Sequence, residues 1–321
     1  PLGLVAMLCL RAPAKINLYL RVLGKRPDGY HELETVFERV DLADELAFEA
    51  SRELALTCDD PSLPCGEDNL VLRAARLLQQ ATGCGAGARI HLTKRIPIAA
   101  GLGGGSSDAA AAMVGLNQLW NLWLESSHLM ELGASLGSDV PFFLAPTAFA
   151  VGRGRGEQCE PLPPEPPLVH VLVVPPERLS TREVYAGTQI DLTARKPSIT
   201  MVLHALRNGS LGELAEGLWN DLQPEAIRRC PVLATIQAHL RASGCLGTLV
   251  SGSGSAVFGL CPDRPRAQEI VARLPAPDGF AWRSQASGAQ AGICQRPAHS
   301  WRIEIIQTDH PSPVVVTPTR G

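Results

Sequence analysis

The stretch that decides the fold reads Pro97-Ile98-Ala99-Ala100-Gly101-Leu102-Gly103-Gly104-Gly105-Ser106-Ser107-Asp108, and four alanines follow at 109–112. Four of the five residues at 101–105 are glycine, and glycine lets the backbone approach a ligand with no Cβ in the way. Ser106 or Ser107 can cap a following helix, whose first N–H groups point into the loop. A patterned strand precedes it, so the stretch predicts a phosphate-binding loop at a helix N-terminus.

This loop differs from the two commonest nucleotide-binding loops. A P-loop has a lysine directly after its last glycine, and no lysine follows here. The Rossmann fingerprint needs Gly-x-Gly-x-x-Gly, whereas Gly101, Gly103 and Ser106 give Gly-x-Gly-x-x-Ser. A flexible linker is the alternative, but a linker would not lie between a patterned strand and a capped helix.

Upstream of the loop, every even position from 10 to 22 is apolar, which is the period of a half-buried strand. Lys15 and Asn17 then share the opposite face, which we expect to point away from the core. The other elements predicted in this half are a helix at 68–81 that Asp68 or Asn69 caps and Gly83 ends, a strand at 90–96, and helices at 106–120 and 127–136.

Residues 161–167 (PLPPEPP) suit neither a strand interior nor a helix, so we place a domain boundary there. The predicted domains are 1–160 and 161–284. The elements predicted in the second are a strand at 168–174, a mostly helical stretch at 198–243 capped by Ser198, two strands around a loop at 251–255, a helix at 264–274 and a strand at 279–284. Mixed but not alternating elements indicate an α+β fold. We expect 285–321, with an apolar patch at 301–306, to be a loosely held tail of unknown role.

The bulk composition is that of a globular protein: 45% of the 321 residues are hydrophobic and 19% charged. The net charge of −3 gives no broad field to gather nucleic acid or anionic lipid. Nine cysteines without a Cys-x-x-Cys pair suggest reduced thiols and a cytoplasmic location. No apolar run reaches the roughly 20 residues of a membrane helix, and no signal peptide is expected at 2–10, where no basic segment precedes the apolar residues.

Three motifs in order resemble those of the GHMP kinases: Ala12–Leu18, the glycine loop, and Gly247–Ser255. The resemblance covers residues 10–284. It implies a two-domain α+β fold, with an N-terminal domain like domain 2 of ribosomal protein S5 and a ferredoxin-like C-terminal domain. It also implies ATP as phosphate donor. The residues implied on the ATP side are Asn69, Lys94, Pro97, Ile98, Ala99, Ala100, Gly101, Leu102, Gly103, Gly104, Gly105, Ser106 and Ser107.

Within the family, Lys15–Leu18, Asp28–Leu33 and Gly137–Phe143 resemble the branch that phosphorylates a cytidine diphosphate-linked methylerythritol on its 2-hydroxyl, in the non-mevalonate route to isoprenoid precursors. In this resemblance Asp139 is the base that accepts the hydroxyl proton. Lys15 keeps Asp139 ionised and offsets charge on the transferring phosphoryl group. Magnesium is expected to arrive with the nucleotide, with Ser107 as a possible contact.

The same resemblance implies residues that hold the acceptor. Tyr30 and His31 are the expected cytidine pair, because a ring can stack on the pyrimidine and an imidazole can hydrogen-bond its edge. Tyr185 would supply the opposite stacking face. The other acceptor residues implied are Asn17, Thr181, Gly252 and Ser253, the last two in the loop toward the substrate diphosphate.

Structural alternatives remain open for several of these residues. Asp139 can cap a short helix at Val140-Pro141, Asn69 can cap its own helix, and Lys15 can be a solvated strand lysine. Two other functions also remain open. A homoserine or mevalonate kinase would share the loop but lack the Tyr30-His31 pair, and a non-catalytic nucleotide- or RNA-binding module would lack Asp139 or Lys15. We expect a monomer or weak homodimer.

Overall fold

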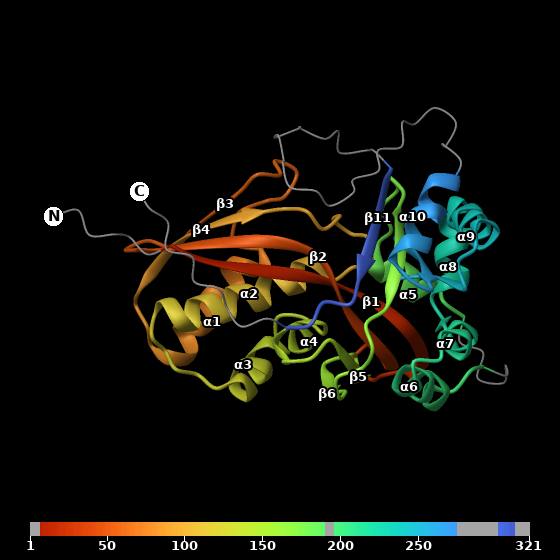
Figure 1. Ribbon diagram of the computed structural model, residues 1–321. Helices are drawn as coiled ribbons and strands as arrows, with labels where there is room; N and C mark the ends of the chain where they lie inside the picture. Colours follow the sequence, from red (N-terminus) through yellow and green to blue (C-terminus); the bar gives the residue numbers. More distant parts are fainter. Residues whose placement is uncertain (1–6, 190–195, 275–300, 312–321) are drawn as a thin grey trace.

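The computed structural model describes residues 7–189, 196–274 and 301–311, which form two sheets and the helices that cover them (Figure 1). The first sheet has seven strands in the order β3-β4-β2-β1-β8, with β5 paired to β2 and β6 to β5. Its strands are β1 (Leu8–Lys25), β2 (His31–Ser51), β3 (Ala55–Cys58), β4 (Gly87–Thr93), β5 (Phe149–Gly154), β6 (Gln158–Pro161) and β8 (Trp219–Asn220). β1 and β2 are antiparallel and form the long centre of this layer.

The second sheet has four antiparallel strands in the order β11-β7-β10-β9. Its strands are β7 (Val169–Val174), β9 (Gly247–Val250), β10 (Val257–Cys261) and β11 (Arg302–Gln307). Helices separate β7 from β9 and β10 from β11, which gives the β-α-β-β-α-β arrangement of a ferredoxin-like domain. The predicted α+β class and ferredoxin-like second domain are therefore confirmed.

Ten helices occur in the described part of the chain. Those of the first half are α1 (Leu70–Thr82), α2 (Gly104–Leu119), α3 (Ser126–Gly133) and α4 (Val140–Leu144). Those of the second half are α5 (Thr181–Gly187), α6 (Ile199–Asn208), α7 (Leu211–Gly217), α8 (Gln223–Arg229), α9 (Val232–Ser243) and α10 (Arg264–Arg273). In Figure 1 α2 lies against the β1–β2 layer with α1 and α4 beside it and α3 next to α4, whereas α8, α9 and α10 lie against the second sheet. None of these helices has the length and apolar character needed to cross a bilayer.

Helix boundaries follow the capping signals in most places. Asn69 accepts from Val71 N at 2.9 Å at the start of α1, and Gly83 ends that helix with φ of 70°. Ser198 caps α6 as predicted. The predicted capping of α2 by Ser106 or Ser107 is wrong, because α2 begins two residues earlier, after Gly103 with φ of 71° and without a side-chain cap. The alanine run is nevertheless helical.

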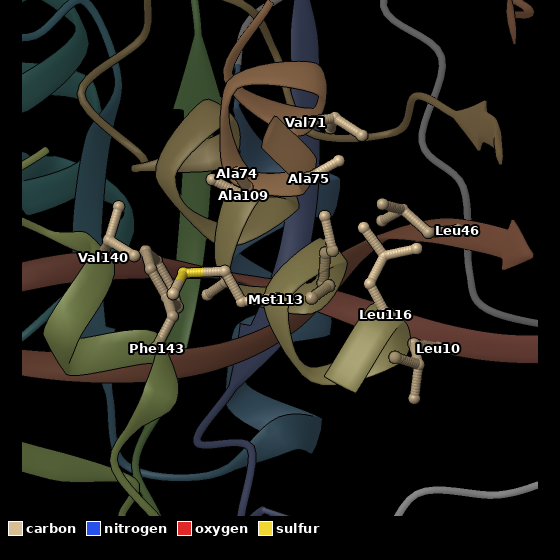
Figure 2. Packing of buried hydrophobic residues seen from close by; sticks show 14 of the residues in the cluster. Leu10, Leu46, Val71, Ala74, Ala75, Ala109, Met113, Leu116, Val140 and Phe143 are labelled. Atoms are coloured by element: carbon tan, nitrogen blue, oxygen red, sulfur yellow. The ribbon is translucent and has the colours of Figure 1, made fainter. Parts of the chain in front are cut away.

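The core of the first half lies between the long strands and α1, α2 and α4. Ala109 and Ala112 of α2 are fully buried, and small side chains let α2 lie close to α1. Figure 2 shows Ala74 and Ala75 of α1 beside Ala109 and Met113 of α2, with Val140 and Phe143 of α4 on the other side of Met113. Close packing therefore fixes α2, which carries the glycine loop at its N-terminus.

At Lys15 and Asn17 the odd-numbered face of β1 does not point to open solvent, so the alternative of a solvated strand lysine is wrong. Lys15 is only 4% exposed and Asn17 only 2%. Two loops cover these side chains, because a Cβ at Gly103 would lie 3.0 Å from Lys15 Cγ and a Cβ at Gly252 would lie 3.3 Å from Asn17 Oδ1. Period-2 alternation identified the strand but not what covers its polar face.

Part of the C-terminal segment, residues 301–311, has a defined place in the fold. Residues 302–307 form β11, which pairs with β7 as the fourth strand of the second sheet, so the expectation of a loosely held tail is wrong there. The strand predicted at 279–284 lies outside the described residues. The domain limits of 1–160 and 161–284 stay a prediction. Eight of the nine cysteines are described, and all eight are free thiols as predicted; Cys294 lies outside the described residues.

Candidate active site

A cavity of about 1000 Å³ lies between the first sheet and the second half of the chain. Every residue predicted for the site lines this cavity except Ser107. Those that do are Lys15, Asn17, Tyr30, His31, Asn69, Lys94, Pro97, Ile98, Ala99, Ala100, Gly101, Leu102, Gly103, Gly104, Gly105, Ser106, Asp139, Thr181, Tyr185, Gly252 and Ser253. Ser107 is buried in α2 instead, and its Oγ has no hydrogen-bond partner among the described residues.

Lys15 and Asp139 meet at the centre of the cavity. Lys15 Nζ lies 3.6 Å from Asp139 Oδ2, and the lysine side chain is 6% exposed against 29% for the aspartate. Asp139 directly precedes α4, but its side chain makes no capping hydrogen bond. The capping alternative for Asp139 is therefore not supported, and its carboxylate is available to a group in the cavity.

A chain of hydrogen bonds fixes the lysine. Lys15 Nζ donates to Asn17 Oδ1 at 2.7 Å, and Asn17 Nδ2 donates to Thr35 Oγ1 at 2.8 Å. Thr35 in turn donates to the Tyr19 carbonyl. The amide of Asn17 thus serves Lys15 and Thr35 in this structure, so it positions the ammonium group whether or not it also contacts a substrate.

The glycine loop passes very close to other backbone. Gly101 has φ of 78°, and a Cβ there would lie 2.1 Å from the Ser251 carbonyl oxygen. At Gly103 a Cβ would lie 3.0 Å from both Lys15 Cγ and the Phe143 ring. Lys15 N donates to Leu102 O at 3.0 Å, so the loop and β1 are joined directly.

Lys94 and two carboxylates brace the ends of this loop. The ammonium group of Lys94 contacts Asp44, and also Asp108 Oδ2 at 2.8 Å. Asp44 also accepts from the backbone N–H of Ile96 at 2.8 Å, just before the loop. Burial raises the pKa of Asp108 to about 7, although Lys94 opposes this shift. The ammonium of Lys94 is therefore already neutralised by protein carboxylates, although its side chain does line the cavity.

The second glycine loop packs on the first. Ser251 Oγ donates to Gly101 O at 3.0 Å, and Ala256 N donates to Ala100 O at 3.0 Å. A Cβ at Gly252 would lie 3.3 Å from Lys15 Nζ. This loop is therefore more than an ordinary hairpin turn, since it holds the first loop and closes the cavity behind Lys15.

Aromatic side chains gather at the mouth of the cavity. Tyr30 is 55% exposed, and the Arg155 guanidinium lies 4.9 Å from its ring centroid. The His31 and Tyr185 rings stack at 5.3 Å. Burial, helped by Lys25, lowers the pKa of His31, which favours the neutral imidazole with one donor and one acceptor nitrogen. Burial and then the charge of Asp139 raise the pKa of Tyr185.

Sequence reasoning missed several residues of the site, of which four bear on its geometry. Thr35, Arg155 and Asp108 line the cavity, and Asp44 braces its edge. Asp108 ends the quoted glycine-loop stretch, but nothing in the sequence assigns it a role. The others come from β2 and the end of β5, where no motif marks them, and only the pairing of distant strands brings them in.

A magnesium ion that arrives with a nucleotide fits these residues. No cluster of three or more His, Cys, Asp or Glu side chains suited to a metal occurs in the described ranges. Asp108 lines the cavity beside the loop, and its Oδ1 has no hydrogen-bond partner among the residues described. Mg²⁺ in phosphate-transfer sites takes one or two carboxylates and keeps its other ligands from phosphate and water, so Asp108, buried beside the loop, would be the carboxylate that contacts such an ion.

Two protein-family models match the chain. The GHMP kinases N terminal domain matches residues 69–146, and the GHMP kinases C terminal domain matches residues 202–277. A 4-diphosphocytidyl-2-C-methyl-D-erythritol kinase from Pelotomaculum thermopropionicum is 48% identical over 264 residues, which is 82% of this chain and 92% of that protein.

Solved structures agree with these relatives. A crystal structure of 4-(cytidine 5'-diphospho)-2C-methyl-D-erythritol kinase superimposes with a TM-score of 0.73 at 36% identity, covering 94% of this chain and 99% of that one. The homoserine kinase from Cytophaga hutchinsonii has a TM-score of 0.68 at 21% identity, covering 84% and 89%. The homoserine kinase therefore supports the fold alone, whereas the first structure also shares the sequence.

Proposed function

Because this chain belongs to the GHMP kinase family, and within it to the 4-diphosphocytidyl-2-C-methyl-D-erythritol kinases, we propose that it transfers the γ-phosphate of ATP to the 2-hydroxyl of that cytidine-linked acceptor. The products are ADP and the acceptor 2-phosphate. Such a reaction needs little covalent chemistry from the protein, so catalysis is positioning plus electrostatic stabilisation.

Asp139 is the base in this proposal. Its carboxylate is partly exposed to the cavity and lies 3.6 Å from Lys15. As the acceptor oxygen attacks phosphorus, Asp139 takes the hydroxyl proton, and Lys15 stabilises the carboxylate and the charge on the phosphoryl oxygens. The contact between these two residues is the single observation that carries the proposal.

The glycine loop holds the phosphates of ATP. Its glycines bring backbone close to the ligand, and the first turn of α2 adds N–H groups that lack helical partners. Asn69 and Ser106 line the same side of the cavity. Magnesium, when bound with the nucleotide, supplies neutralisation of the phosphate charge.

The acceptor lies on the opposite side. Tyr30 and the His31–Tyr185 stack supply aromatic faces for a pyrimidine, and neutral His31 can both donate to and accept from a base edge. Asn17, Thr181, Gly252 and Ser253 line the path from there to Lys15. The Tyr30-His31 pair favours this acceptor over homoserine or mevalonate, and the presence of both Asp139 and Lys15 argues against a non-catalytic module.

A substrate panel tests the proposal. The chain is incubated with ATP, Mg²⁺ and either 4-diphosphocytidyl-2-C-methyl-D-erythritol, homoserine or mevalonate, and ADP release is followed by a coupled assay. We expect release only with the first acceptor, with a new phosphate monoester in the ³¹P spectrum. Release with homoserine or mevalonate instead would mean that the acceptor assignment is wrong. The cytoplasmic location and the monomer or weak homodimer stay predictions.

A further inference from the structure

We infer that Arg39 is a positioning residue for the reaction, which holds the helix α4 and through it the carboxylate of Asp139. The inference rests on the proposed function, since it assigns Asp139 the role of base. Arg39 lies on β2, outside the cavity lining, and belongs to none of the three sequence motifs. Its contacts are therefore the evidence.

Arg39 is a buried cation whose partners are carbonyl oxygens. The residue is 6% exposed, and its Nη2 donates to the carbonyls of Phe142, Phe143 and Ala145 at 3.3, 3.2 and 2.9 Å. Burial lowers the pKa of Arg39 to about 10, which leaves it charged at neutral pH. Carbonyls at a helix C-terminus carry partial negative charge and attract a cation. Arg39 thus caps the C-terminal end of α4.

Helix α4 touches each part of the proposed catalytic centre. Asp139 is the residue directly before it. The Phe142 ring stacks at 4.9 Å on Phe37, and Lys15 Nζ lies 5.7 Å from the centroid of that same Phe37 ring. Phe143 packs against Gly103 of the glycine loop, where a Cβ would lie 3.0 Å from its ring. Five residues of helix therefore connect the base, the lysine and the loop.

The C-terminal segment pins Arg39 from the other side. The backbone N–H of Asp309 donates to the Arg39 carbonyl at 2.9 Å, and the neighbouring Val40 forms a β-bridge with Thr308. Thr308 Oγ1 also donates to buried Glu38 at 2.6 Å. The segment beyond β11, whose role the sequence did not indicate, thereby holds the stretch of β2 that carries Arg39.

Small displacements of Asp139 should be costly. A shift of about 1 Å in a catalytic group can lower the rate about 100-fold, because the reacting atoms lose alignment. Without Arg39, the buried carbonyls of α4 would lose a charged donor, and this short helix would lose the contact that ties it to β2. The acceptor's cytidine side is assigned to Tyr30, His31 and Tyr185, none of which is among the contacts of Arg39, so its binding should change little.

Steady-state kinetics of Arg39→Met and Arg39→Lys test the inference. We expect kcat of Arg39→Met to fall about 10- to 100-fold, with the acceptor KM within about threefold of the parent. Arg39→Lys keeps a cation without the planar fork, so it should recover part of kcat. An unchanged kcat in Arg39→Met, after correction for the folded fraction, would overturn the inference.

A matched control separates positioning from general destabilisation. Ile270→Ala opens a cavity in α10, remote from α4, where Ile270 is fully buried. When Ile270→Ala and Arg39→Met lose the same thermal stability, kcat of Ile270→Ala should stay near the parent value. If kcat fell equally in both variants, Arg39 would act through stability alone, which would overturn the inference.

Hydrogen exchange of the peptide that covers α4 gives a readout that needs no acceptor. It should exchange faster in Arg39→Met and not in Ile270→Ala, whereas unchanged protection of α4 would overturn the inference. If the parent protein is inactive with the acceptor, the proposed function fails while this arm still decides whether Arg39 holds α4.

Discussion

The two halves of the cavity are built from different material. The proposed nucleotide half, which is the loop at 97–105 with the first turn of α2, is mostly backbone and is held by the 251–256 loop. The proposed acceptor half, which is Tyr30, His31 and Tyr185, is made of side chains from elements distant in sequence. A backbone site depends on the absence of Cβ atoms, whereas a side-chain site depends on ring identity. Substitutions should therefore fail in different ways on the two sides.

The largest effect is expected at Gly101. A Cβ there would lie 2.1 Å from Ser251 O in a residue with φ of 78°, so the loop must move to accept it. Strain of about 1–3 kcal/mol and this clash together should weaken ATP binding by about 100-fold in Gly101→Ala, as measured by calorimetry. Gly83→Ala at the end of α1 is the control, since its φ is also positive (70°) but its Cβ would meet nothing within 4 Å. Similar losses in both variants would contradict the close approach of the two loops.

The acceptor half should respond through KM alone. Tyr30 is 55% exposed, so its removal costs little stability. Stacking of a base on an aromatic ring contributes about 1–3 kcal/mol, so Tyr30→Ala should raise the acceptor KM roughly 10-fold or more. The KM of ATP should stay within about twofold, and Tyr30→Phe should retain most acceptor affinity. An increase in the KM of ATP in Tyr30→Ala would instead contradict the assignment of Tyr30 to the acceptor alone.

The free energy of unfolding should depend on pH through Asp108, which contacts Lys94 beside the glycine loop. The pKa of Asp108 is raised from 3.8 to about 7 by burial, so the folded chain keeps a proton that the unfolded chain releases. The free energy of unfolding should then fall as pH rises from about 4 to 7. Asp108→Asn should remove roughly 1–2 kcal/mol of that fall, because Lys94 and Asp44 share the equilibrium.

Urea unfolding at pH 5 and pH 8 measures this difference. The control Glu131→Gln changes an exposed carboxylate on α3 and should leave the pH dependence of the free energy of unfolding as in the parent. If Asp108→Asn kept the pH dependence of the parent, groups other than Asp108 would cause it.

The smallest effect is expected where the second loop supports the first. Ser251 Oγ donates to Gly101 O at 3.0 Å, and one such hydrogen bond contributes about 1 kcal/mol. Ser251→Ala should lower the free energy of unfolding by that amount and raise the KM of ATP only about two- to fivefold. Ser135→Ala, which removes an exposed hydroxyl bonded to Leu132 O, is the control for loss of a hydroxyl. If Ser251→Ala and Ser135→Ala changed the KM of ATP equally, the 251–256 loop would not support the ATP-binding loop.

Local signals predicted the glycine loop and the two ends of α1 well. The glycine loop, the Asn69 cap and the Gly83 stop depend on neighbours within a few residues, and the structure has all three. Ser107 was placed wrongly because α2 begins at Gly104, which turns that hydroxyl into the core. A helix can begin at a glycine without a side-chain cap. The sequence pattern does not distinguish a start at Gly104 from a start after a Ser106 or Ser107 cap.

Contacts between distant segments were harder to predict. The burial of Lys15 depends on the second half of the chain packing over β1, and alternation within β1 carries no information on it. Arg155 over Tyr30 joins the end of β5 to a turn more than one hundred residues earlier. β11 lies within the stretch predicted as a loosely held tail, because polar residues separate it from α10. Its pairing with β7 in the second sheet depends on a strand more than one hundred residues earlier.

The most direct measurement is kcat of Asp139→Asn together with its dissociation constant for ATP in the same preparation. Asparagine keeps the shape of the side chain but cannot accept the hydroxyl proton, so kcat should fall by about 100-fold or more. ATP affinity should stay close to that of the parent, because the nucleotide half is intact. A variant that keeps its kcat, or that loses ATP binding with it, would contradict the assignment of Asp139 as the base between the two halves.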